Sequence, residues 1–333
     1  MFERVTCTYV EGRTQGSAGV GGAKDESCET DIWTVNAGGG GERLLTRKPS
    51  GEGQDAAWSP DGRRIAFVGG VDLWLMNPDG SGQKRLTQVG FEDDPAWSPD
   101  GRRIAFAGGP EGDDLLVMNA DGTGKRRLTS MPAVQDLVWS PDGRRIAFSY
   151  GGNAIYVINA DGTKRRRLAD ATGAPAWSPD GRRIAFDASS GVDDNGISNS
   201  DVFVIGVNGV GLRRLTDNLE IDRYPSWSPD GRRILFVSQR LGNYFRLYVM
   251  KADGTGQRRV TRDNGGNDDS NWGEDDPAWS PDGRRIAYEL GSGVDTRDGI
   301  YVINADGTGQ RKVAQDTCAC EGPIWQPSSG QRR

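Results

Sequence analysis

Acidic residues stand shortly before a tryptophan at five places along the chain. They are Asp55, Asp94, Asp136, Asp222 and Asp276. Carboxylates that lie close together raise one another's pKa or attract cations. If folding brings these five residues together, we expect a negatively charged surface that binds a cation or a basic partner.

An oxygen-rich segment adds a second place for a hard cation. Residues 193–196 read Asp-Asp-Asn-Gly, and Asp201 follows them. Carboxylate and amide oxygens are the ligands that Ca²⁺ prefers in proteins. Neither this segment nor the acids before the tryptophans form a complete metal-binding motif, so we predict no cofactor and keep calcium as the one candidate ion.

Histidine is absent from the 333 residues. The Ser-His-Asp and Cys-His mechanisms and metals held by histidine are therefore excluded. The 49 glycines lie mostly in turns beside Asp and Asn, and none forms a phosphate-binding loop between a strand and a helix. A glycosidase or lyase that uses two carboxylates stays open as an alternative, although no pair of acids stands out.

The four cysteines lie near the two ends of the chain. They are Cys7, Cys28, Cys318 and Cys320. Disulfides that join the two ends would restrict the unfolded chain and stabilise the fold by about 2–5 kcal/mol each. Two pairings link the ends and both stay open, while a bridge between Cys318 and Cys320 would be strained. Zinc is the rival interpretation, but the cysteines at 318 and 320 lack the usual two-residue gap.

These chemical groups must be positioned by a repeated element. The string Trp-Ser-Pro-Asp-Gly-Arg-Arg-Ile begins at Trp58, Trp97, Trp139, Trp177, Trp227 and Trp279. A second string follows each one, with Asn-Ala-Asp-Gly or a variant of it before a basic run and Leu-Thr or a variant of that pair. In both strings Asp-Gly separates two short β-rich segments, which is typical of hairpins. Four strands in a period of about 40 residues predict the blade of a β-propeller.

The two ends of the chain complete the count of blades. Residues 3–46 contain three of the four strands of a blade, and Trp325 follows Trp279 in phase with the repeat. We therefore predict one all-β domain over residues 1–333, a seven-bladed propeller of four-stranded antiparallel blades. One blade combines residues 1–46 with 318–328, and the others start near residues 55, 94, 136, 174, 224 and 276. This closure would remove exposed sheet edges.

The repeats resemble those of TolB-like β-propellers, which are distant relatives of WD-repeat propellers. The resemblance rests on Trp-Ser-Pro-Asp-Gly-Arg-Arg-Ile-Ala-Phe and on Asn-Ala-Asp-Gly-Thr-Gly before Arg-Arg-Leu-Thr, and it covers nearly the whole chain. TolB itself has six blades and an additional α/β domain, for which this chain has no room. Peptidases with similar propellers need a separate hydrolase domain, and the related lyases rely on histidine. The resemblance thus implies a propeller, and we expect no enzyme.

The two sides of such a ring differ in sequence. We name the side with the Pro-Asp-Gly and Ala-Asp-Gly turns the consensus face, and the opposite side, with loops of variable length, the variable face. Most of the 41 Lys and Arg residues lie in the repeated strings, whereas many acids lie in variable loops such as 92–94, 111–114, 268–269 and 274–276. We expect an acidic variable face and a more basic consensus face. The alternative is that the loop acids are merely solvated and that the arginines bridge to turn aspartates or to the next blade.

Variable loops on a rigid scaffold are where binding usually resides. The repeated tryptophans and phenylalanines are expected to pack between blades. Tyr244 and Trp272 do not belong to the repeat, and we expect them to be exposed aromatic anchors for a partner. The alternative for Tyr244 is that it begins a strand. The residues predicted to bind a partner are Asp93, Asp94, Asp136, Asp222, Tyr244, Trp272, Asp275 and Asp276.

We therefore expect a binding scaffold that docks a protein with a basic surface through the acidic variable face and the mouth of the central channel. The alternatives are a propeller that binds a carbohydrate or another small ligand, and the glycosidase or lyase named above. The net charge of −6 argues against nucleic acid. No stretch is long and apolar enough to span a membrane. Disulfides would imply a periplasmic or secreted protein, and we expect a monomer.

Overall fold

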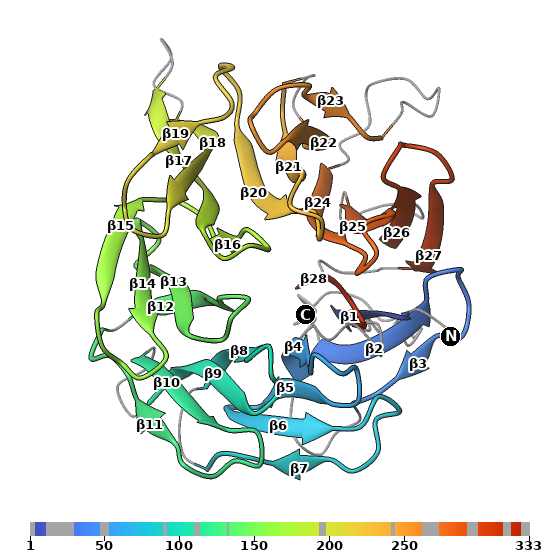
Figure 1. Cartoon of the computed structure of the whole chain (residues 1–333). Coiled ribbons are helices and arrows are strands. Elements are labelled where there is room, and N and C mark those ends of the chain that lie inside the picture. Colours follow the sequence, from blue (N-terminus) through green and yellow to red (C-terminus); the bar gives the residue numbers. More distant parts are fainter. Residues whose placement is uncertain are drawn as a thin grey trace, which may run out of the picture.

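The computed structural model describes residues 4–10, 30–46, 53–88, 92–109, 114–131, 133–192, 198–240, 244–261, 273–291, 299–315 and 321–327. These residues form strands and turns, without a helix among them. The strands pair into seven four-stranded antiparallel sheets, which are arranged around a central axis (Figure 1). The predicted all-β propeller is confirmed.

Each sheet runs outward from the axis through four strands (Figure 1). The innermost strands are β28 (Glu321–Trp325), β4 (Gly53–Trp58), β8 (Asp93–Trp97), β12 (Val134–Trp139), β16 (Ala176–Trp177), β20 (Asp222–Trp227) and β24 (Gly273–Trp279). The second strands are β1 (Arg4–Val10), β5 (Ile65–Gly69), β9 (Arg103–Gly108), β13 (Arg145–Tyr150), β17 (Arg183–Val192), β21 (Arg233–Ser238) and β25 (Arg285–Gly291). The third strands are β2 (Thr30–Asn36), β6 (Asp72–Met76), β10 (Asp114–Asn119), β14 (Ala154–Asn159), β18 (Ser198–Gly206), β22 (Arg246–Lys251) and β26 (Gly299–Asn304). The outer strands are β3 (Arg43–Leu44), β7 (Lys84–Arg85), β11 (Arg126–Arg127), β15 (Arg166–Asp170), β19 (Arg213–Arg214), β23 (Arg258–Arg259) and β27 (Arg311–Gln315).

We number the sheets as blades in this order, so that blade 1 contains β28, β1, β2 and β3, and blade 7 contains β24 to β27. Blade 1 therefore combines strands from both ends of the described chain. Val5 of β1 pairs with Trp325 of β28, and Thr6 pairs with Ile324. Cys7 lies in β1 opposite Trp33, while Cys28, Cys318 and Cys320 lie outside the described residues. The predicted disulfides thus stay a prediction.

The repeated turns are fixed by short-range hydrogen bonds. In blade 2, the Ser59 hydroxyl donates to Asp61 Oδ1 at 2.6 Å, and the main-chain N–H of Arg64 donates to Ser59 Oγ at 2.9 Å. Gly62 has a φ of +65°, a left-handed conformation that glycine adopts without strain. In the second turn, represented by blade 3, Thr123 donates its N–H to Asp121 Oδ1. Short polar side chains therefore specify both turns locally.

The blades are joined by an arginine and a tryptophan in each repeat. The guanidinium of Arg103 lies over the ring of Trp139 in the next blade, 4.7 Å from its centroid, and Trp139 Nε1 donates back to the carbonyl of Ala96 at 3.0 Å. Arg285 and Trp325 repeat the stacking between blades 7 and 1. These repeated side chains thus hold neighbouring blades together.

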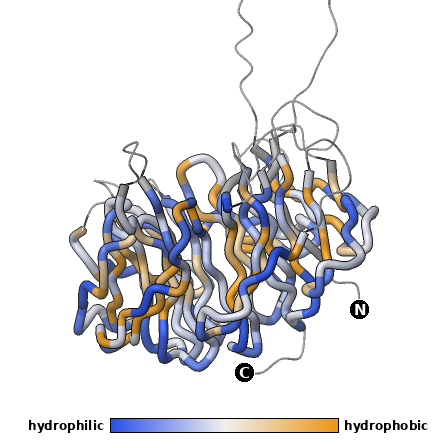
Figure 2. Tube along the Cα trace, turned by 90° about the horizontal axis from the view of Figure 1, so that it is seen from above, coloured by the Kyte–Doolittle hydropathy of each residue, from blue (hydrophilic) through white to orange (hydrophobic). Residues whose placement is uncertain are grey.

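The core consists of layers between adjacent blades. One layer contains Leu115 and Val117 of blade 3 with Ile146 and Phe148 of blade 4. In β5, all five residues are buried, because each blade is covered on both of its faces. Figure 2 views the ring edge-on, with the strands running between its two faces.

Candidate functional site

The innermost strands carry a β-bulge near their variable-face ends. The register shifts between Asp93 and Ala96 in blade 3, and blades 2, 4, 6 and 7 show the same irregularity. One residue in each bulge has a left-handed conformation: Asp55 (φ +46°), Asp94 (+57°), Asp136 (+54°), Tyr224 (+53°) and Asp276 (+44°). Aspartate tolerates this conformation better than most residues. Four of the predicted axial acids therefore also have a local structural role.

Asp94 links blades 3 and 4. Its Oδ2 accepts the main-chain N–H of Leu137 at 3.3 Å, and Asp93 Oδ1 accepts the N–H of Asp94 at 3.0 Å. The pKa of Asp94 is raised to about 7, mainly by burial and to a smaller extent by the nearby carboxylate of Asp136. Asp93 and Asp136 are exposed. The predicted crowding of acids near the axis is thus present between these two blades.

Asp187 of β17 is a further acid near the axis, which the repeated pattern does not indicate. Blade 5 has Ala174 at the position where other blades have the bulge aspartate. Asp187 Oδ1 accepts the N–H of Tyr224 in blade 6 at 3.0 Å, and Thr172 donates to its Oδ2 at 3.0 Å. Burial raises the pKa of Asp187, and Asp136 adds to the rise. The signal in the sequence was an acid after the repeated phenylalanine, where β5, β9 and β21 have Val, Ala and Val.

Blades 6 and 7 complete the group with an ion pair. Arg223 Nη2 lies 2.6 Å from Asp275 Oδ2, and the Arg223 guanidinium lies 3.7 Å from the ring centroid of Phe245 and 4.7 Å from that of Tyr224. Asp276 is half-buried and lies against Gly322 of β28, where a Cβ atom would come within 2.2 Å of the Asp276 Cβ. Asp275 is thus neutralised by Arg223.

We name Asp93, Asp94, Asp136, Asp187, Tyr224, Asp275 and Asp276 the axial group. Its members interact in sequence round the axis from blade 3 to blade 7. Burial raises the pKa of Asp94 and Asp187, and Asp136 adds to both rises. Burial also raises the pKa of the Tyr224 phenol, Arg223 lowers it, and Asp275, Asp276 and Asp187 raise it by smaller amounts. This arrangement places carboxylates around one aromatic ring and can attract a positively charged group.

Asp222, one of the residues predicted to bind a partner, lies in the interior of the protein. Its side chain is fully buried and pairs with Arg240 at 2.8 Å. Burial raises the pKa of Asp222, and Arg240 counteracts this rise. Asp222 is the first residue of β20 and stands five residues before Trp227, two positions earlier than the bulge residues. At that position the side chain does not reach the surface.

The two predicted aromatic anchors have different outcomes. Tyr244 is half-buried, and the guanidinium of Arg246 lies over its ring, 5.7 Å from the ring centroid. It stands two residues before β22, so the alternative that it begins that strand is not what the structure shows. Trp272 lies outside the described residues.

Several acids of the variable loops are not available to a partner. Glu92 and Glu274 are buried, and Asp114 is buried and paired with Arg127 at 2.9 Å. On the basic side, Arg126 donates to the carbonyls of Ala160 and Asp161 in the next blade. The alternative that repeat arginines bridge to the next blade therefore holds for these residues, and the exposed charge of the variable face is smaller than the sequence suggests.

The calcium interpretation gains no support from the part of the chain that the structure describes. Within that part, no group of three or more Cys, Asp or Glu residues is arranged to hold a metal ion. Residues 193–197 lie outside it, and Asp201 is fully buried and paired with Arg214.

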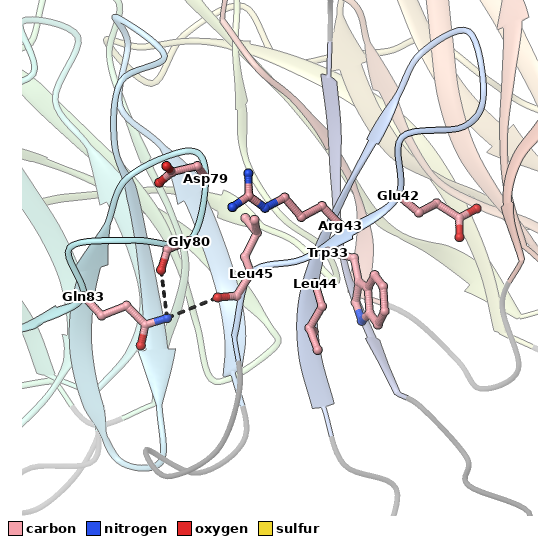
Figure 3. Close-up of a pocket in the computed structure, with 8 residues that line it drawn as sticks. All are labelled: Trp33, Glu42, Arg43, Leu44, Leu45, Asp79, Gly80 and Gln83. Atoms are coloured by element: carbon pink, nitrogen blue, oxygen red, sulfur yellow. Dashed lines mark hydrogen bonds between the residues drawn. The ribbon is translucent and has the colours of Figure 1, made fainter.

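A groove of about 650 Å³ lies between the outer parts of blades 1 and 2 (Figure 3). Its lining residues are Trp33, Glu42, Arg43, Leu44, Leu45, Asp79, Gly80 and Gln83. Gln83 Nε2 bridges the carbonyls of Leu45 and Gly80 at 3.1 and 3.3 Å. Gln257 makes the same bridge to Leu215 and Gly254 further round the ring, so this contact is part of the joint between blades. None of the predicted binding residues lies in the groove.

Comparison with protein families agrees with the geometry. Residues 168–276 match the TolB beta propeller domain, and residues 27–109 match the N-terminal region of dipeptidyl peptidase IV. The match over residues 168–276 supports the predicted resemblance to TolB-like propellers. No curated protein matches its sequence. No helix among the described residues is long and apolar enough to cross a membrane.

Solved structures with a similar fold include a TolB protein and two enzymes. TolB from Acinetobacter baumannii is 16% identical with a TM-score of 0.54, over 90% of this chain and 80% of that one. An oligogalacturonate lyase from Vibrio parahaemolyticus is 13% identical with a TM-score of 0.57, over 80% and 74%. A puromycin-hydrolyzing peptidase from Mycobacterium tuberculosis is 15% identical with a TM-score of 0.66, over 88% of this chain and 50% of that one.

These neighbours overturn the expectation that the chain is no enzyme. That expectation rested on the absence of histidine and of a separate hydrolase domain, but a lyase, a peptidase and the dipeptidyl peptidase IV region share the fold or the repeat. A fold hosts many chemistries, and identities this low establish the fold alone.

Proposed function

We propose that the protein binds another protein through the axial group on its variable face. The observation that carries this proposal is the set of acids at the axis, where Asp93 and Asp136 are exposed and Asp94 accepts an N–H from the next blade. Burial raises the pKa of Asp94 and Asp187, and the carboxylate of Asp136 adds to both rises. Carboxylates that repel one another in this way are relieved when a positive charge approaches. The partner is expected to present a basic surface.

The scaffold suits this role because the two exposed acids are not needed to join neighbouring blades. Stacked pairs such as Arg103 with Trp139 hold the blades, whereas Asp93 and Asp136 are exposed at the axis. A binding surface on a ring of seven blades closed by β28 would be preorganised, and little conformational entropy would be lost on association. We further propose a periplasmic or secreted location, where end-joining disulfides could form.

The experiment is an affinity capture from envelope and secreted extract under oxidising conditions. The wild-type protein is compared with a variant that carries Asp93→Asn and Asp136→Asn. Asparagine retains an oxygen that accepts the hydrogen bonds from the Asp94 N–H and the Ser149 hydroxyl, so the fold is preserved while two negative charges are lost. We expect a basic partner that the wild type captures and the variant releases.

The matched control carries Asp121→Asn and Asp161→Asn. These residues lie in the same two blades but in the turns of the consensus face, where each accepts hydrogen bonds from a threonine. The change in net charge is identical, and this control should capture the partner as the wild type does. Equal loss in both variants, or capture that neither variant weakens, would contradict docking at the axial group.

A further inference from the structure

Tyr224 departs from the pattern of the blades around it. Three residues before the repeated tryptophan, blades 2, 3, 4 and 7 have aspartate, and blade 6 has Tyr224. All five residues have a left-handed backbone, which is unfavourable for a large aromatic residue and tolerated by aspartate. The other blades demonstrate that a small polar residue suffices here, so a local structural need does not explain the tyrosine.

The ring of Tyr224 lies on a rigid support. Its main-chain N–H is held by Asp187 at 3.0 Å. The Arg223 guanidinium lies over the ring, 4.7 Å from its centroid, and also over the ring of Phe245, and it is fixed by Asp275. A ligand would therefore approach the part of the Tyr224 ring that Arg223 leaves exposed. A side chain whose neighbours are locked in this way loses little freedom on binding.

Tyr224 is also exposed, which sets it apart from the other repeat aromatics. It retains 37% of its accessible surface, whereas the aromatic rings of the second strands, such as Phe148 and Phe236, are fully buried. Leu219, in the loop that leads into the same strand, is 82% exposed. Tyrosine on a preorganised support is enriched among the residues that dominate protein interfaces.

The charges around the ring determine which ligand it suits. Burial raises the pKa of the Tyr224 phenol most, and Asp275, Asp276 and Asp187 raise it further. Arg223, whose guanidinium lies over the ring and pairs with Asp275, lowers it. An aromatic face surrounded by carboxylates favours an ammonium or a guanidinium group.

We propose that Tyr224 is the anchor for a lysine or arginine side chain of the partner protein, with Asp187 and Asp276 supplying the surrounding charge. This inference rests on the proposed function and names its central contact. A neutral sugar stacked on the same ring is the rival ligand, and the experiment separates the two.

The test titrates the full chain with a capped peptide of alternating glycine and lysine, measured by calorimetry at low salt. A glycine–glutamate peptide and a panel of neutral oligosaccharides are titrated in parallel. Tyr224→Phe keeps the aromatic face and should bind the lysine peptide within about twofold of the wild type. Tyr224→Asn suits the left-handed backbone, so it should fold, and it should bind the peptide about five- to tenfold more weakly.

Two results would overturn the inference. One is a Tyr224→Asn variant that binds the lysine peptide as tightly as the wild type. The other is a ring-dependent affinity for a neutral oligosaccharide that exceeds the affinity for the peptide. If Asp93→Asn with Asp136→Asn weakens peptide binding while Tyr224→Asn does not, the proposed docking function stands and only the anchor is wrong. If the wild type binds no cationic peptide, both proposals fail.

Discussion

Two sectors of the ring differ in how neighbouring blades are joined at the axis. The first sector consists of blades 3 and 4, and the second of blades 6 and 7. In the first sector, aspartates occupy the bulges and Asp94 accepts an N–H from the next blade. In the second sector a tyrosine occupies one bulge, Asp187 of blade 5 accepts its N–H, and an arginine–aspartate pair joins the blades. The repeated backbone therefore permits different side chains, provided that each main-chain donor finds an acceptor. The sector with the less favourable residue is the one that exposes an aromatic ring.

The two sectors should differ most in the loss of stability when an acid is replaced, because one acid is buried and paired while the other is exposed. Asp222→Ala leaves the Arg240 guanidinium without its carboxylate in a buried site and should lower the free energy of unfolding by about 3–5 kcal/mol. Asp136→Asn, at an exposed position of the other sector, should change it by less than about 0.5 kcal/mol. Urea denaturation of both variants measures the difference. Equal losses would mean that the two sectors do not differ as described.

Replacing Asp187, the hydrogen-bond acceptor from blade 5, should lower the stability by a smaller amount. Asp187→Ala removes the acceptor of the Tyr224 N–H and of the Thr172 hydroxyl, which should cost about 1–3 kcal/mol of stability. Asp187→Asn keeps an acceptor and is the control, with a loss well below that of the alanine variant. If both variants are as stable as the wild type in urea, Asp187 does not replace the bulge aspartate.

The acids of blades 3 and 4 should make stability depend on pH. The pKa of Asp94 is about 7 in the folded protein against an ordinary value of 3.8, so the folded state binds this proton more tightly than the unfolded state. Stability is then lost as pH rises from about 4 to about 7, by an amount of the order of 3 kcal/mol. Asp94→Asn should remove this loss.

The control for this effect is Asp100→Asn in the consensus turn of the same blade. Hydrogen bonds from Ser98 and the Arg102 N–H, with nearby arginines, outweigh desolvation and lower the pKa of Asp100, so its titration lies below that range. This variant should keep the slope of the wild type between pH 4 and pH 7. A wild-type stability that rises over the range would contradict the assigned direction.

The smallest effect concerns the backbone of the bulges. Tyr224→Asn should raise stability by about 1 kcal/mol, because asparagine tolerates a φ of +53° better than tyrosine does. The reciprocal change Asp136→Tyr should lower it by a similar amount. Thermal unfolding of the pair is the measurement. A stabilised Asp136→Tyr variant would remove the argument that blade 6 retains its tyrosine for binding.

The sequence by itself determined the parts that short-range chemistry specifies. Asp-Gly turns, the β-rich segments between them and the period of the tryptophans predicted strands, hairpins and an all-β propeller. The same pattern pointed to Asp94, Asp136 and Asp276 as neighbours of the axis. Each of these features depends on residues close together in the chain, whose preferred conformations survive in any blade.

Only the tertiary structure decided which acids are exposed. Asp93, Asp222 and Glu92 look alike as loop acids in the sequence, yet Asp93 is exposed while Asp222 and Glu92 are buried. Arg223, Asp275 and Phe245 lie far apart along the chain and meet only when blades 6 and 7 pack. The cost of burying a charge depends on the partners that other blades bring, and a local pattern does not contain them.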